Sequence, residues 1–134
     1  MISHLLDSNA CIDHLRHGKS SKVSHQLDAM PPGSVVLCSV VIAELVFGAR
    51  RSVNPTSALK QVTHYCDPFD SIPFEDSAAE VYGLVKADLF AKGTPIGPND
   101  LLIAAIAIAN GLTLVTHNTS EFGRIAGLAL EDWQ

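Results

Sequence analysis

Two aspartates stand at the start of predicted helices, where a carboxylate can do chemistry. Asp7 directly follows a short apolar run at residues 2–6, and Asp100 opens the apolar stretch 101–110. Parallel strands gather their polar groups at one edge of a sheet, and a first-turn acid lies at the positive end of its helix. Either aspartate alone also has a structural explanation, as a helix cap or as a first-turn charge.

A third carboxylate, Glu44, lies among apolar neighbours. It falls inside a predicted helix at 40–51, between Ala43 and Leu45. A carboxylate in such surroundings is unfavourable unless it has a partner. Glu44 alone could equally be a solvated residue on the edge of the helix.

Asn118 and Glu121 complete the candidate set, just after another apolar run at 112–116. Binding of one shared cation would give these five polar residues a common function, although each of the acids alone also has a structural explanation. Magnesium suits them, with Mn²⁺ as an alternative, because a hard cation binds carboxylates, waters and a substrate phosphate. A metal held in this way can activate a water and stabilise charge that builds on a phosphate.

The predicted elements bring these residues to one edge of a sheet. Apolar strands are expected at 2–6, 35–38, 69–72, 112–116 and 128–130, and helices at 10–17, 20–29, 40–51, 55–66, 75–91 and 101–110. This alternation predicts one α/β domain over 1–134, with a central, mainly parallel β-sheet flanked by helices on both faces. The last helix is apolar nearly all round, so we expect it to be central and buried.

Local signals predict the ends of some elements. Ser8 or Asn9 is expected to cap the first helix, and Ser39 is expected to cap the helix at 40–51. Residues 118–122 are expected to form a polar turn.

The bulk composition indicates a folded protein that we expect to be soluble and cytoplasmic. The chain has 134 residues, of which 47% are hydrophobic and 17% charged. It shows no signal peptide and no run long enough to span a membrane, and its three cysteines match no disulfide or zinc spacing. The net charge of −5 argues against nucleic-acid binding by bulk charge, so any affinity for RNA would depend on a bound cation and a few rim residues.

Four motifs resemble those of the PIN-domain family, and more closely those of its VapC-type toxins from bacterial toxin–antitoxin pairs. In chain order they are LLDSN at 5–9, SVVIAEL at 39–45, PNDLLIAA at 98–105 and LVTHNTSEF at 114–122. Together they span essentially the whole chain, in the order and at the separations typical of the family.

The resemblance implies a metal-dependent endoribonuclease that cuts RNA and arrests translation. Asp7, Glu44 and Asp100 would form the core acidic triad at the metal, with Asp7 and Asp100 as direct magnesium ligands. Asn118 falls where many relatives carry a fourth aspartate, and it would position a water or a ligand. Glu121 would supply the fourth acid through a water.

Further residues would border the site or contact RNA. Asn9, Ser39 and Thr116 resemble polar residues around the family's site. The cationic candidates for RNA contacts, each of which could instead be a plain surface residue, are His117, Arg50, Arg51, Lys86, Lys92 and Arg124.

The resemblance also implies partners. These are a cognate VapB-type antitoxin, a second copy of the chain in a homodimer, and a toxin–antitoxin hetero-oligomer in which the antitoxin, rather than this chain, recognises DNA. Leu45, Val46 and Phe47 would belong to the core or to a groove for an antitoxin helix. The similarity to enteric members implies initiator tRNA, cut in its anticodon stem-loop, as the substrate.

Other functions fit the residues less well. A catalytically inactive PIN-like module that binds RNA or a partner is the alternative, and the intact acidic triad argues against it. A phosphatase of the haloacid-dehalogenase type would need an aspartate where Asn9 stands. No glycine-rich phosphate loop follows any predicted strand, which argues against nucleotide hydrolysis.

Overall fold

One parallel sheet organises the protein, whose computed structural model describes all residues from 1 to 134. Its strand order is β3-β2-β1-β4-β5, and every pairing is parallel, which confirms the predicted sheet. The strands are β1 (His4–Leu6), β2 (Val35–Cys38), β3 (Ser71–Ile72), β4 (Thr113–Val115) and β5 (Leu130–Glu131).

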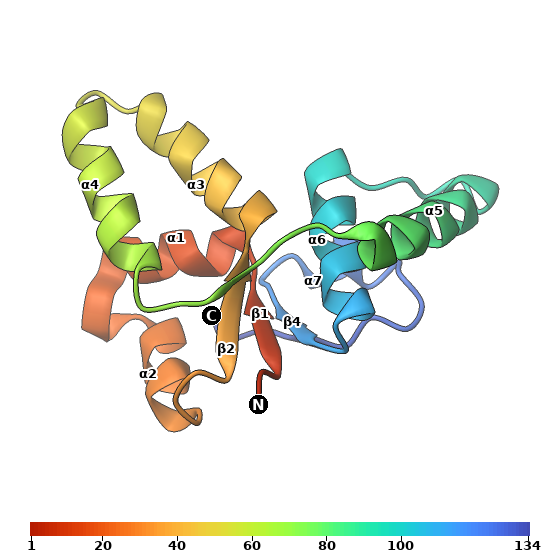
Figure 1. Ribbon diagram of the computed structural model, residues 1–134, viewed down its shortest axis with the longest axis horizontal. Helices are drawn as coiled ribbons and strands as arrows, with labels where there is room; N and C mark the ends of the chain where they lie inside the picture. The colour runs from red at the N-terminus through yellow and green to blue at the C-terminus, as the bar shows by residue number, and fades with distance from the viewer.

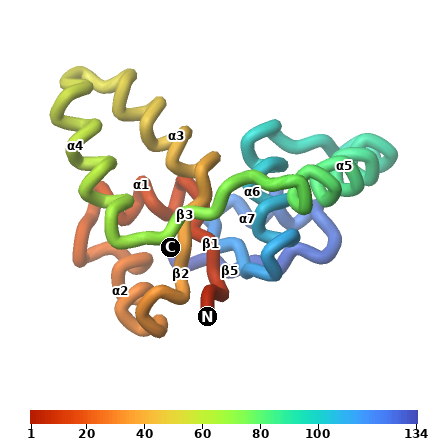
Figure 2. The backbone as a smooth tube through the Cα atoms, viewed as in Figure 1, coloured from red at the N-terminus to blue at the C-terminus, as the bar shows by residue number.

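Helices cover both faces of this sheet, as predicted. Figure 1 shows α1 to α4 on one side of the strands and α5 to α7 on the other, and Figure 2 shows how the segment after α4 crosses between the two groups. The helices are α1 (Ser8–His17), α2 (Lys22–Ala29), α3 (Ser39–Arg50), α4 (Pro55–Cys66), α5 (Asp76–Ala91), α6 (Pro98–Ala109) and α7 (Thr119–Phe122), with a 3₁₀ turn at Gly18–Ser20. None of them combines the length and the apolar character that a bilayer crossing requires.

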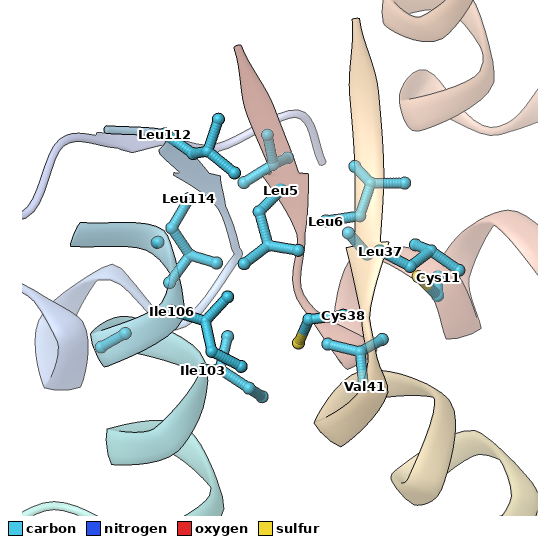
Figure 3. Packing of buried hydrophobic residues seen from close by; sticks show 14 of the residues in the cluster. Leu5, Leu6, Cys11, Leu37, Cys38, Val41, Ile103, Ile106, Leu112 and Leu114 are labelled. Atoms are coloured by element: carbon cyan, nitrogen blue, oxygen red, sulfur yellow. The ribbon is translucent and has the colours of Figure 1, made fainter. Parts of the chain in front are cut away.

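The three inner strands, β2, β1 and β4, are largely apolar because both of their faces are covered. All four residues of β2 are buried, and α6 buries six of its twelve residues, as expected for a central helix. Figure 3 shows Leu5 and Leu114 pointing toward Ile106, on the α6 side of the sheet. This packing fixes α6 against β1 and β4, and it brings the first turn of α6 near the end of the sheet where β1 stops.

The ends of three elements differ from the prediction. Neither Ser8 nor Asn9 caps α1: Asp7 has the extended backbone of a cap, and its carboxylate accepts the N–H of Ser8. Helix α3 begins at Ser39 itself, with Cys38 at the cap position and no capping side chain, so the prediction of Ser39 as a cap is wrong. The expected polar turn at 118–122 contains the short helix α7, since the N–H of Phe122 reaches the carbonyl of Asn118 and closes a helical turn.

Candidate active site

Asp7 lies buried at the end of β1, with only 3% of its surface exposed. One carboxylate oxygen accepts the N–H of Ser8 at 2.8 Å, and the other accepts the hydroxyl of Thr116, also at 2.8 Å. Thr116 can reach it because it follows β4, the strand next to β1. Burial raises the pKa of Asp7 despite these two hydrogen bonds, and the charges of Glu44 and Glu121 raise it further.

Asp100 lies half-buried in the first turn of α6, and no protein group donates a hydrogen bond to its carboxylate. Burial and the charges of Asp7, Glu121 and Glu44, in that order, raise the pKa of Asp100 to about 6. The four acids therefore interact across one site, although they come from four different helices or strand ends. Either a proton or a cation would relieve their mutual repulsion.

Glu44 has a partner that the sequence did not reveal. The hydroxyl of Ser8 donates to Oε1 of Glu44 at 2.5 Å, so the start of α1 is joined to the middle of α3. Ser8 is itself buried. Its signal in the sequence was only its place directly after Asp7, which suggested a cap rather than a bond to a second acid.

Asn118 and Glu121 are bonded to each other. The side-chain amide of Asn118 donates to Oε2 of Glu121 at 2.9 Å, and the backbone N–H of Gly97 donates to Oε1 at 3.0 Å. These two bonds lower the pKa of Glu121, in contrast to the raised values at Asp7 and Asp100. The backbone N–H of Asn118 also donates to the hydroxyl of Thr116, at 3.0 Å.

The donor set fits a hard divalent cation, but its ligands are not assembled in advance. No three His, Cys, Asp or Glu side chains stand close enough together to hold a metal ion as they are placed. The chemistry still suits such an ion: the site offers carboxylate oxygens, Asp100 has no donor from the protein, and burial together with the neighbouring acids raises the pKa of both aspartates. A cation at this site would need the carboxylates to draw closer.

The other predicted border residues divide into two kinds. Thr116 is buried and bonded to Asp7, so the structure brings it into the site. Asn9 and Ser39 are exposed near the starts of α1 and α3, and their side chains make no hydrogen bond within the protein.

The six cationic candidates are exposed and scattered over four segments of the chain. Five of them have partners within the protein: Arg51 with the Phe47 ring, Lys86 with Tyr82 and the Phe90 ring, Lys92 with Asp88, His117 with Asp132 and Arg124 with the Pro95 carbonyl. Arg50 alone has none of these partners, and Arg51 has only its contact with the Phe47 ring. Their contact with RNA stays a prediction.

Removing the Ser8 hydroxyl should impair the site more than the fold. We expect Ser8→Ala to slow catalysis by roughly tenfold, because groups that orient site ligands commonly contribute 10- to 100-fold. The loss in free energy of unfolding should be about 1 kcal/mol, the usual net value of one hydrogen bond. Ser8→Thr, which keeps the hydroxyl, is the control, and equal activity of the two variants would contradict the role of this bond.

Comparison with known proteins identifies the family. The PIN domain model matches residues 4–128, nearly the whole chain. The chain belongs to the PIN-domain family. The sequence motifs that resembled this family lie at Asp7, Glu44, Asp100 and Asn118, the same segments that the fold brings to one end of the sheet.

Full-length relatives of this PIN-domain chain carry VapC names. It is 35% identical over 133 residues to the tRNA(fMet)-specific endonuclease VapC of Shigella flexneri, with 99% of each chain covered. It is 33% identical over 130 residues to ribonuclease VapC2 of Rickettsia felis, with 97% of each covered. The structure matches a chain of the DNA-bound VapBC complex of Salmonella typhimurium with a TM-score of 0.94, at 33% identity over the full length of both chains. These matches confirm the predicted family, fold and enzyme class, a nuclease.

Proposed function

We propose that this PIN-domain chain is a magnesium-dependent endoribonuclease toxin, with Asp7, Glu44 and Asp100 as its metal-binding acids. One observation carries the proposal: Asp7 and Asp100 lie at the same end of the sheet, where burial and then the charges of neighbouring acids raise the pKa of both carboxyl groups. Carboxyl groups with raised pKa values are concentrated at the functional sites of proteins. The names of the full-length relatives, endonuclease and ribonuclease, support the same chemistry.

The residues of the chain hold and orient the carboxylates. Thr116 and the N–H of Ser8 fix the Asp7 carboxylate, and the Ser8 hydroxyl fixes Glu44. Asp100 keeps both oxygens available at the mouth of the site. Mg²⁺, or Mn²⁺ in its place, would activate a water and neutralise charge on the phosphodiester.

The substrate belongs to the same proposal. The Shigella relative is named for initiator tRNA, and we extend that substrate, cut in its anticodon stem-loop, to this chain. Mapping of cellular RNA ends after brief induction tests it, with new ends expected in one tRNA loop. New ends spread over many messenger RNAs would support ribonuclease activity but contradict initiator tRNA as the substrate.

Expression of the chain alone should arrest growth by stopping translation. We expect Asp7→Asn to abolish the arrest, because the amide keeps the size and much of the hydrogen bonding of the buried side chain but loses its charge. Colony counts after induction measure the effect, and Glu80→Gln, on the exposed surface of α5, is the control. Full toxicity of the Asp7 variant at equal protein level would contradict the assignment of Asp7 to the active site.

One observation favours the alternative, an inactive module that binds RNA: the carboxylates form no ready-made metal cluster. Thermal unfolding distinguishes the two functions. A metal-binding site should gain about 2.7 kcal/mol in free energy of unfolding at roughly one hundred times the dissociation constant of Mg²⁺. An unchanged melting temperature between saturating Mg²⁺ and chelator, together with absent cleavage, would favour the inactive module.

A groove beside the site suits the proposed VapB-type antitoxin. A cavity of about 380 Å³ lies between α1, α3 and α4, with Glu44 and Arg16 among its polar lining residues. Its apolar lining is Ile12, Leu15, Leu45, Ala49, Ala58 and Val62. An amphipathic antitoxin segment could bury its apolar face here and direct a cationic side chain toward Glu44.

Filling this groove should weaken antitoxin binding. Gly48 lines it, and an added side chain would meet no atom within 4 Å at its Cβ, so Gly48→Trp is expected to lower antitoxin affinity at least about tenfold without disturbing α3. Gly83→Trp is the matched control, because Gly83 is also helical and open but lies on α5, away from the groove. Equal affinity of the two variants in calorimetry would place the antitoxin elsewhere.

The homodimer and the toxin–antitoxin hetero-oligomer are further parts of this proposal, as is a cytoplasmic location. Leu84 and Phe90 of α5 are 75% and 64% exposed, and a second copy of the chain could cover them. In this assembly we expect the antitoxin to recognise DNA. Sedimentation of the free chain tests the dimer.

A further inference from the structure

Both carboxylate oxygens of Glu121 are engaged inside the protein. Oε1 accepts the backbone N–H of Gly97, and Oε2 accepts the side-chain amide of Asn118. The side chain of Asp100 receives no such donor, although it faces the same site. The two acids therefore have different tasks.

The bond to Gly97 supplies a hydrogen-bond acceptor at the start of α6, where no side chain of the helix itself acts as a cap. Gly97 occupies the cap position without a side chain that could cap the helix, and Pro98 has no N–H to offer. Glu121 reaches this point from 24 residues further along the chain. The loop is tied a second time, because Arg124 donates to the carbonyl of Pro95 at 3.0 Å.

On its other side, Glu121 is connected to Asp7. Asn118 donates its side-chain amide to Glu121 and its backbone N–H to the hydroxyl of Thr116, which in turn donates to Asp7. These bonds form one continuous path from Gly97 to Asp7. The path joins the segment that precedes Asp100 to the strand end that carries Asp7.

We propose that Glu121 is a positioning residue that, with Asn118, holds the loop before α6 and so sets Asp100 relative to Asp7, and that it is not a metal ligand. The metal-binding role of Asp100 in this inference rests on the proposed function, whereas the hydrogen bonds of Glu121 are independent of it. The inference revises the expectation from sequence, in which Glu121 supplies a fourth acid through a water.

The two roles make opposite demands on the charge of Glu121. A residue that holds the loop needs side-chain atoms that can hydrogen-bond to Gly97 and to Asn118, whereas an acid that serves the metal needs its negative charge. Glu121→Gln removes the charge and keeps an acceptor for Gly97. Its amide can also donate to Asn118 once the Asn118 amide turns over.

The test compares Glu121→Gln with Glu121→Ala, with Glu80→Ala on α5 as the control. We expect the glutamine variant to keep the slow hydrogen exchange of the Gly97 amide, and to keep Mn²⁺ affinity and RNA cleavage within about threefold of the unmodified protein. The alanine variant should exchange the Gly97 amide about tenfold faster and lose roughly tenfold or more in cleavage. Asn118→Ala, which removes one of the two bonds, should fall between them.

The exchange of the Gly97 amide is measured by NMR, and the affinity for Mn²⁺ alone by electron paramagnetic resonance. A glutamine variant that loses as much Mn²⁺ affinity and cleavage as the alanine variant would overturn the proposal, because the charge would then be what matters. Unchanged exchange at Gly97 in the alanine variant would overturn it as well. If the unmodified protein cleaves no RNA, the proposed function fails, and Gly97 exchange still decides whether Glu121 holds the loop.

Discussion

Replacing Asp100 with asparagine is expected to abolish RNA cleavage and, in the absence of metal, to raise the melting temperature. Cleavage should fall at least about a hundredfold, since a direct ligand contributes more than the 10- to 100-fold typical of residues that only orient ligands. The gain in stability follows from the raised pKa of Asp100, about 6. The metal-free fold therefore disfavours the ionised form of Asp100, which the proposed activity requires.

The direction of the stability change follows from proton binding. Because its pKa is about 6 in the folded protein against a reference value of 3.8, Asp100 holds its proton more tightly in the folded state. The stability that the protonated form contributes is present at low pH and is lost as the pH rises through about 6. Asparagine stays neutral, so the variant avoids this loss at neutral pH and should match the unmodified protein near about pH 4.

The expected gain is about 1 kcal/mol at neutral pH, because a half-buried carboxylate stays partly solvated. For a chain of this size this is a rise of roughly 3–5 °C, which calorimetry in chelator can measure. Saturating Mg²⁺ should close or reverse the difference, since only the unmodified protein binds the ion well. If the variant melts at a lower temperature than the unmodified protein in chelator, the fold does not disfavour the charge of Asp100. Normal RNA cleavage by the variant would show that Asp100 is not an active-site residue.

The places of Asp7 and Asp100 were predictable because local rules determine them. Asp7 directly follows an apolar strand, and parallel strands place such residues at one edge of the sheet. Pro98 followed by an acid is typical of the first turn of a helix, and the apolar residues beyond it required α6 to be buried. Each of these inferences uses neighbours within about one turn or one strand.

The hydrogen bonds of the site were not predictable, because they join residues that are distant along the chain. Ser8 and Glu44 are 36 residues apart, and Thr116 and Asp7 are 109 apart. Periodicity and capping signals describe single elements, whereas these bonds depend on how the elements pack. Arg124 illustrates the same limit: it was a candidate for RNA contact, and it donates to the backbone of its own protein.

Lowering the pH from about 7.5 to about 5 is expected to slow cleavage at subsaturating Mg²⁺ by about tenfold or more. With a pKa of about 6, only about a tenth of Asp100 is ionised at pH 5, and only the ionised form can bind a cation. Asp7, whose pKa is also raised, adds to the loss. Glu121, whose pKa is lowered, should not contribute in this range.

Metal concentration provides the decisive control, because proton and cation compete for the same carboxylates. Raising Mg²⁺ should move the midpoint of the pH profile to lower pH, and the apparent dissociation constant of Mn²⁺ should rise about tenfold for each pH unit below about 6. A general loss of structure in acid would instead lower cleavage at every Mg²⁺ concentration alike. Metal affinity that stays constant between about pH 7 and pH 5 would mean that neither raised aspartate binds the ion, so this experiment tests the acids at the proposed centre independently of any substitution.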